Sequence, residues 1–263
     1  MTEPVNAQVR YLNPEWKGSS EPPHIGDRDS RRANTSKHEV SIYDARGLEL
    51  GLDSAGFLLT NHESAVRDFH DKEEVAATYY REVTDLIQNL TGADEVFIAE
   101  HVVRTEDTSD FNSAYARFVH CDYSTTDPQA YAQRTLELRE VELDPARQWE
   151  FAWYNTWQPI EREVQQNPLA MIDVRTLAEG DVVDYYFTGY GNEILTSMPV
   201  FNPQHRFYQF SRMQTNELLV LKQLDTRPGL RFSCPHTSFD LEAPADALPR
   251  RSIEVRLMCA FGG

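Results

Sequence analysis

Basic residues are scarce in this sequence. Its 263 residues include 25 Lys and Arg against 42 Asp and Glu, which gives a formal net charge of −17. A charge of this sign repels phosphate backbones, so we expect no nucleic-acid binding through charge neutralisation. The sequence also has no apolar stretch that approaches the roughly 20 residues of a membrane-spanning helix. We therefore expect no membrane partner either.

Cysteine is rare as well. Cys121, Cys234 and Cys259 are an odd number without paired spacing, which favours reduced thiols over a disulfide framework. The first residues, MTEPVNAQVRYLNPEW, lack the apolar core of a secretory signal. Apolar residues make up 40% and charged residues 25% of the chain, which is typical of globular proteins. These features predict a cytoplasmic protein that acts on a small molecule or a protein.

One segment has little to bury. Residues 14–37 are rich in Pro, Gly, Ser and charge, and we interpret residues 1–37 as a mobile N-terminal arm. No second linker is visible, so residues 38–263 are expected to form a single domain.

The pattern predicts few helices. Apolar residues recur at three- and four-residue spacing over about 72–90, with Asp71 placed to cap the helix and Gly92 to end it. A shorter helix is expected to begin at Asp127-Pro128, where an acidic cap precedes a proline.

Strand-like segments fill most of the remaining chain, because β-branched and aromatic residues are concentrated in them. These segments are 96–104, 116–122, 149–157, 182–189, 206–213, 217–224, 231–238 and 252–260. Helices between them are too few for parallel βαβ units. The sequence therefore predicts a mainly β protein with flanking helices, a double-sheet jelly roll.

A candidate metal site lies in the segment around residue 121. His120 and Asp122 are two apart in a strand-like segment, so their side chains project to one side while Cys121 points away. A third ligand must come from elsewhere, and His236 in CPHTSF is the best candidate. Two histidines and a carboxylate form the facial triad of non-haem Fe(II) oxygenases, which leaves positions open for O₂ and a bidentate cosubstrate.

Each part of this site has an alternative explanation. An Asp two residues after a His is common by chance, and the pair could belong to a polar strand end. His205 is a rival third ligand, but it follows Pro203 at the start of a loop, where exposure to solvent is expected. His101 is expected to be a hydrogen-bonded structural histidine.

Downstream of His236, the segment PRRSIEVR alternates in a way that indicates an anion site. Arg250 and Ser252 fall on one strand face with Glu254 and Arg256, and a guanidinium with a hydroxyl suits the distal carboxylate of 2-oxoglutarate. The alternative is a solvated edge strand. Whether Arg250, Arg251 or Arg256 would bind the cosubstrate stays open at this point.

Asn155 and Trp157 share another strand face and could line the cosubstrate pocket. Trp149, Phe151 and Trp153 follow the same alternation, so a packed aromatic core face is the competing interpretation.

Several segments, in matching order, resemble a known family. They are YDARG (43–47), DSAGFLL (53–59), AVRDFHDKEEV (65–75), TGADEVF (91–97), VHCDYS (119–124), WYNTWQPI (153–160), PLAMID (168–173), NELLVLKQLDT (216–226), CPHTSFD (234–240) and PRRSIEVR (249–256). Together they resemble the CmcJ/AsaB group of secondary-metabolism oxygenases, which includes gibberellin-desaturase-like proteins, over about residues 40–258.

The resemblance implies a double-stranded β-helix fold and Fe(II)/2-oxoglutarate chemistry. By motif match it implies His120, Asp122 and His236 as metal ligands, and Arg250 with Ser252 as the cosubstrate anchor. The family usually has N-x-W-R-P where this chain has Gln158 before Pro159. If the family arginine contacts a carboxylate, this chain binds that group more weakly or binds a different one.

The expected function is therefore oxidation of an unactivated C–H bond of a small secondary metabolite or amino-acid-derived substrate, with Fe(II), 2-oxoglutarate and O₂. Hydroxylation, desaturation and ring closure all fit. The alternatives are a cupin-like metal enzyme without 2-oxoglutarate and a non-catalytic accessory protein of a biosynthetic pathway. A homodimer or a pathway partner protein is compatible with the sequence.

Overall fold

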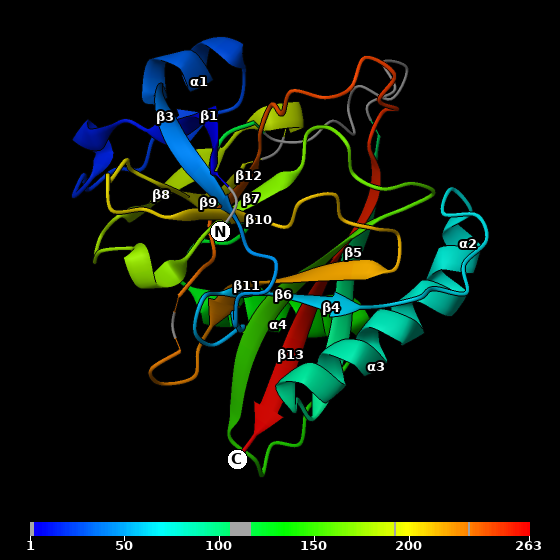
Figure 1. Ribbon diagram of the computed structural model, residues 1–263. Helices are drawn as coiled ribbons and strands as arrows, with labels where there is room; N and C mark the ends of the chain where they lie inside the picture. Colours follow the sequence, from blue (N-terminus) through cyan, green and yellow to red (C-terminus); the bar gives the residue numbers. More distant parts are fainter. Residues whose placement is uncertain (1–2, 106–116, 192, 231) are drawn as a thin grey trace.

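Strands dominate the part of the chain that the computed structural model describes, which comprises residues 3–105, 117–191, 193–230 and 232–263. They form two five-stranded sheets and a three-stranded sheet among these residues. Figure 1 shows the sheets stacked in layers, with the longest helical segment along one outer side. This arrangement confirms the predicted mainly β jelly roll.

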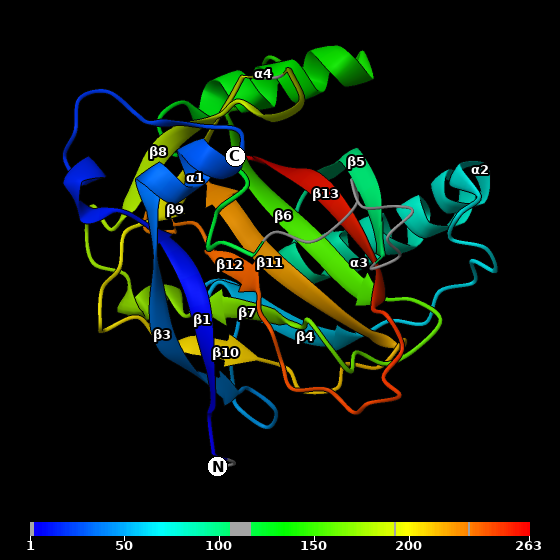
Figure 2. The ribbon, with the colours of Figure 1, turned by 90° about the horizontal axis from the view of Figure 1, so that it is seen from above.

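The first large sheet has the order β4-β11-β6-β13-β5, and its pairings are antiparallel. Its strands are β4 (Phe57–Asn61), β11 (Glu217–Asp225), β6 (Trp149–Pro159), β13 (Arg251–Gly262) and β5 (Glu95–Thr105). Four of them match segments predicted as strands. Figure 2 shows β6, β11 and β13 side by side in this sheet.

The second large sheet has the order β1-β3-β10-β7-β12. Its strands are β1 (Val5–Leu12), β3 (Thr35–Asp44), β10 (Phe207–Gln209), β7 (Leu169–Ile172) and β12 (His236–Ser238). The small sheet consists of β2 (His24–Ile25), β8 (Val182–Phe187) and β9 (Ile194–Pro199) in the order β2-β8-β9. Short 3₁₀ turns cover 14–16, 174–176 and 189–191.

The core between the two large sheets takes side chains from both. Phe57, Trp157 and Leu221 come from the first sheet, and Met171 and Tyr208 from the second. Burial of these large apolar groups is the main favourable contribution to this packing.

The helix predicted over 72–90 is present as α2 (Lys72–Glu74), a π-helical turn (Val75–Tyr79) and α3 (Tyr80–Thr91). Asp71 caps it by accepting from the N–H groups of Glu73 and Glu74, and Gly92 ends it in a left-handed conformation. Its apolar stripe packs on the outer face of the first sheet. The second predicted helix, α4 (Pro128–Arg139), is capped by Asp127. No helix among the described residues is both long and apolar enough to cross a membrane.

The prediction of a mobile arm over 1–37 was wrong for two parts of that segment. Residues 5–12 pair with β3 over their whole length, and Val9, Tyr11 and Leu12 of this strand are buried. Residues 28–34 form helix α1, which Asp27 caps through Ser30. The expected domain boundary at residue 38 falls inside β3.

The strand predicted over 116–122 was also wrong in extent. The described part of this segment makes only isolated bridges, from His120 to His236 and from Cys121 to Ser197. It therefore links β12 of one sheet to β9 of another instead of forming a strand of its own.

Candidate metal centre and adjoining pocket

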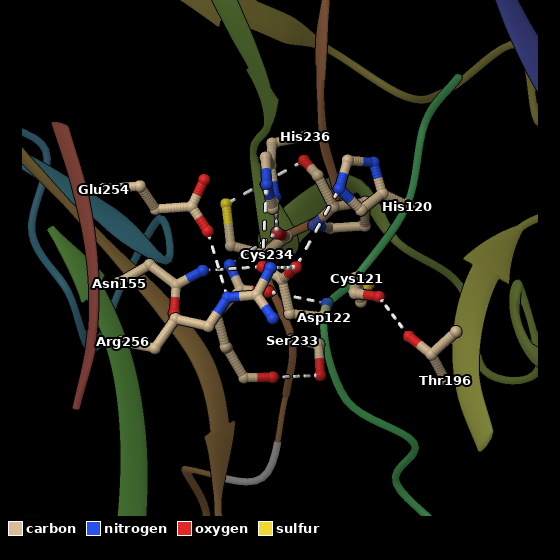
Figure 3. A network of polar contacts seen from close by, with 12 residues as sticks. His120, Cys121, Asp122, Asn155, Thr196, Ser233, Cys234, His236, Glu254 and Arg256 are labelled. Carbon is tan, nitrogen blue, oxygen red and sulfur yellow. Dashed lines mark hydrogen bonds and ion pairs between the residues drawn. The ribbon is translucent and has the colours of Figure 1, made fainter. Parts of the chain in front are cut away.

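Three predicted side chains converge at one point. One ligand atom each of His120, Asp122 and His236 lies within 4.8 Å of the others, and Figure 3 shows the two imidazoles above the Asp122 carboxylate. The Nε2 atoms of His120 and His236 lie 3.9 and 3.7 Å from Asp122 carboxylate oxygens. These separations suit three ligands of one ion.

Backbone carbonyls orient both imidazoles. Nδ1 of His120 lies 2.9 Å from the carbonyl oxygen of Phe118, and Nδ1 of His236 lies 3.3 Å from that of Cys234. Because a carbonyl can only accept, each Nδ1 carries the proton and each Nε2 presents its lone pair. Burial, together with the neighbouring His236, lowers the pKa of His120 to about 4. His120 is thus neutral near pH 7, the form that binds metals.

The Asp122 carboxylate is held by two neighbours on adjacent strands. Asn155 of β6 donates to one oxygen at 2.6 Å, and Arg256 of β13 donates to the other at 2.9 Å. Asn155 and Arg256 face each other in the β6–β13 register. Burial alone would raise the pKa of Asp122, but the charge of Arg256, with those of the two histidines, holds it well below its usual range. The carboxylate is therefore ionised and its orientation fixed.

A β-bulge adds a further support that the sequence did not indicate. The register of β11 against β6 shifts between Lys222 and Leu224, which leaves Gln223 as the extra residue. Its side chain accepts from the backbone N–H of Asp122 at 3.1 Å and donates to the carbonyl of Cys234 at 3.3 Å. Bulges re-aim side chains in this way next to functional sites. No local signal in the sequence reveals a bulge, because it exists only in the pairing of two strands.

A pocket adjoins the three converging side chains. Its lining includes His120 and His236, both predicted pocket residues Asn155 and Trp157, and Arg250. Arg104 and Glu254, which form an ion pair at 3.1 Å, complete one wall. Sequence reasoning did not identify Arg104 as a pocket residue.

The three candidate arginines occupy different places. Arg250 is 2% exposed, lines the pocket and lies with Cζ 5.4 Å from the Trp157 ring centroid. Arg251 donates a hydrogen bond to Glu161 at 2.8 Å, and Arg256 donates hydrogen bonds to Asp122 and Glu254. Ser252 of β13 is fully buried and, unlike Arg250, is not among the residues that line the pocket. Its hydroxyl has no hydrogen-bond partner among the described residues.

Gln158 lies outside the pocket. Its amide oxygen accepts from Tyr79 at 2.7 Å and lies 2.8 Å from a ring nitrogen of His62, while its amide nitrogen donates to the carbonyls of His62 and Thr215. Because Gln158 alternates with Asn155 and Trp157 along β6, it faces the core beneath the helix. Its difference from the family arginine therefore does not change the pocket wall.

His205 and His101 have structural roles. His205 was expected to be exposed, which was wrong: its side chain is 1% exposed and lies between Asp181 at 3.0 Å and the Tyr11 hydroxyl at 3.1 Å. The strand β1, missed from the sequence, is what covers it. His101 is hydrogen bonded to Tyr80 at 2.6 Å, in line with its expected role.

Relatives of this chain are fungal oxygenases. It is 27% identical to "Alpha-ketoglutarate-dependent dioxygenase phiK" of a fungal species, covering 98% of this chain and 96% of the relative. It is 29% identical to "Hydroxylase/desaturase efuI" of Hormonema carpetanum, covering 97% and 94%. These similarities confirm the resemblance read from the sequence.

A solved structure has the same fold. A variant of the iron and alpha-ketoglutarate-dependent endoperoxidase NvfI superimposes with a TM-score of 0.83 at 24% identity, covering 100% of this chain and 99% of the other. A family model described as "Oxidoreductase/YMDC permease-like domain" matches residues 9–260. The chain belongs to this oxidoreductase family.

Proposed function

We propose that this protein is an Fe(II)- and 2-oxoglutarate-dependent oxygenase in which His120, Asp122 and His236 hold the metal. The observation that carries the proposal is the convergence of two imidazoles and one carboxylate within 4.8 Å. This donor set fits Fe(II) with open coordination positions. The names of the relatives, which include dioxygenases and a hydroxylase/desaturase, support the same chemistry.

The adjoining pocket fits 2-oxoglutarate. The guanidinium of Arg250 is buried in its wall and suits a distal carboxylate. Asn155 lines this pocket, and its Oδ1 is buried without a hydrogen-bond partner among the described residues. Buried polar atoms of this kind call for a ligand or an ordered water. Trp157 would pack beside the bound molecule.

Bound iron, with 2-oxoglutarate and O₂, would supply the oxidation of a C–H bond in a small substrate. The chain's own residues do the positioning. Asn155 and Arg256 fix the carboxylate of Asp122, and the backbone carbonyls of residues 118 and 234 fix the two imidazoles. The pocket walls keep bulk water from the reacting centre.

We further propose that the substrate is a small secondary metabolite and that the enzyme acts in the cytoplasm. Two relatives are, by name, an alpha-ketoglutarate-dependent dioxygenase and a hydroxylase/desaturase, both from fungi. Three buried free cysteines suit a reducing compartment.

Anaerobic iron titration combined with succinate analysis tests the function. The wild-type protein should bind one Fe(II) and release succinate in step with substrate oxidation. Asp122→Asn keeps the side-chain shape but removes the charge, so Fe(II) affinity and succinate release should fall by at least 100-fold. Asp246→Asn, at an exposed position, is the matched control and should behave as wild type.

Two results would overturn the proposal. Stoichiometric Fe(II) binding that survives Asp122→Asn would remove the ligand assignment. Substrate oxidation without succinate would favour a cupin-like enzyme that does not use 2-oxoglutarate.

A further inference from the structure

A second cavity is lined almost entirely by basic side chains. Arg10 of β1, Lys37 of β3 and three arginines of α1 converge there with Arg117. The α1 residues are Arg28, Arg31 and Arg32. Figure 1 shows α1 next to the ends of β1 and β3, the strands that supply the other two. Four separate segments of the chain thus direct cationic side chains at one concave surface.

This concentration of positive charge is unusual for so acidic a chain. The cavity gathers six of the 25 Lys and Arg residues of a protein with net charge −17. Like charges this close repel each other, and the repulsion is a cost to folding unless an anion offsets it.

Carboxylate partners for these cations are few. Within the described ranges, the one ion pair in the cluster joins Arg117 to Asp240 at 2.5 Å. Arg10 donates to the hydroxyl and carbonyl of Thr35 instead, and the buried Nε of Arg31 has no hydrogen-bond partner there. Two acids, Asp27 and Asp29, flank Arg28 in the sequence. Asp27 accepts from the backbone N–H of Ser30 at 2.7 Å as the cap of α1, and Asp29 lies in the first turn of that helix.

Two short series of contacts between residues connect the wall of this cavity to the candidate metal centre and its pocket. Cζ of Arg31 lies 5.2 Å from the Phe118 ring centroid, and that ring lies 5.1 Å from the ring of His120. On the other side, Arg117 donates to the side chain of Asn167 at 3.0 Å, and the Asn167 carbonyl accepts from Arg250. The basic cavity is therefore one layer of side chains from the pocket.

We propose that this cavity binds the anionic group, a carboxylate or a phosphate, of a small molecule. Guanidinium groups match the oxygen geometry of both anions, and several of them together give a charge that a single surface arginine does not. The bound group is assigned to the anionic end of the molecule to be oxidised. This assignment rests on the oxygenase function proposed above.

Calorimetric titration of the metal-free protein at low salt tests the binding site itself. Inorganic phosphate and citrate serve as probes. We expect one site for each, with affinity that falls as NaCl is added because exposed charges are screened. Arg31→Gln combined with Lys37→Gln should weaken citrate binding by at least tenfold, and thermal unfolding of the variant reports whether it is folded.

Two further variants complete this test. Arg134→Gln removes one positive charge at an exposed position of α4 and should bind citrate as the wild type does. Arg32→Gln, also exposed, should weaken binding by itself and serves if the double variant does not fold. If the wild-type protein binds neither probe, the proposal is overturned, because carboxylates elsewhere in the chain then neutralise the cluster. Equal citrate binding by wild type and the folded Arg31→Gln/Lys37→Gln variant also overturns it.

A second experiment tests whether the bound anion belongs to the substrate. It uses a substrate identified by its stimulation of succinate release. If the substrate carries the anionic group, citrate should raise the KM for the substrate without changing kcat. The double variant should likewise have a higher KM for the substrate and an unchanged kcat. If citrate binds but leaves the KM for the substrate unchanged, the cavity binds a separate anion. The assignment of the bound group to the substrate is then overturned. Asp122→Asn should still bind citrate, so failure of the iron assignment and failure of the anion site are distinguishable.

Discussion

His120 and His236 are joined by a reciprocal pair of backbone hydrogen bonds. The N–H of His120 donates to the carbonyl of His236 at 3.0 Å, and the N–H of His236 donates back at 2.9 Å. Their ring centroids lie 4.5 Å apart as a result. Two candidate ligands that are distant in sequence are therefore set at metal-binding separation by the backbone itself. Such a preformed site loses little freedom when it binds an ion.

Replacing Gln223 should loosen this arrangement. Its side chain joins the backbone of Asp122 to that of Cys234, two residues before His236. In Gln223→Ala both contacts are lost, and we expect Fe(II) affinity to fall by roughly 10- to 100-fold, as for other residues that orient metal ligands. Anaerobic Fe(II) titration measures this directly.

Gln129→Ala, at an exposed position of α4, is the control for that experiment and should bind Fe(II) normally. Gln223→Glu keeps an acceptor for the Asp122 N–H but loses the donor to Cys234, so an intermediate affinity is expected. An unchanged affinity in Gln223→Ala would mean that the ligand positions do not depend on the bulge.

The candidate site could be read from the sequence where the signal was local. His120 and Asp122 were identified from their two-residue spacing, and Arg250 with Ser252 from strand alternation. The contacts to Asp122 from Asn155 and Arg256 could not, because they depend on the register of β6 against β13. Register is set by many side chains at once and leaves no short motif.

The N-terminal strand β1 was not predicted from the sequence, for a different reason. β1 buries Ala7, Val9 and Tyr11 on alternate positions, which is a strand pattern that can be read from VNAQVRYL. The polar composition of residues 14–37, which follow directly, masks this short pattern. Helix α1 also had a signal, since Asp27 precedes Ser30 at the spacing of a capping box.

Substitution of Arg250 should separate cosubstrate binding from iron binding. Arg250→Lys keeps the charge but cannot make two parallel hydrogen bonds, so the KM for 2-oxoglutarate should rise about tenfold or more while Fe(II) affinity is unchanged. Steady-state succinate formation at varied 2-oxoglutarate gives the KM. Its neighbour Arg251, which pairs with Glu161, provides the control Arg251→Lys. Equal KM values in the two variants would exclude Arg250 as the anchor.

A buried ion pair beside the bulge should be important for stability. The Lys222 ammonium is fully buried and contacts Asp225, also fully buried, at 2.7 Å. Lys222→Ala leaves the Asp225 carboxylate without one of its cations, and loss of a buried partner costs about 3 kcal/mol in the free energy of unfolding. Urea denaturation followed by circular dichroism measures the loss.

The double variant Lys222→Met/Asp225→Asn should recover part of that stability, because the buried carboxylate is then neutral and no longer lacks its ammonium partner. The recovery is only partial because Arg227 also loses Asp225 as its partner. Lys72→Ala, at an exposed position at the start of α2, should cost far less than Lys222→Ala. A similar loss in both single variants would argue against a specific role for the buried pair.

Stability should fall in mild acid partly because of His205. Burial lowers the pKa of this imidazole below its usual value of about 6.5, and the contact with Asp181 only partly opposes the effect. As the pH falls below about 6.5, the unfolded chain takes up the proton first, so the contribution of His205 to stability is complete above that pH and decreases as the pH falls through the folded-state pKa. His205→Gln should therefore reduce the loss of unfolding free energy between pH 7 and pH 5, by at most about 1.4 kcal/mol per pH unit. Urea denaturation at pH 7, 6 and 5 measures the slope, and an identical slope in wild type and variant would show that His205 does not titrate differently in the folded state.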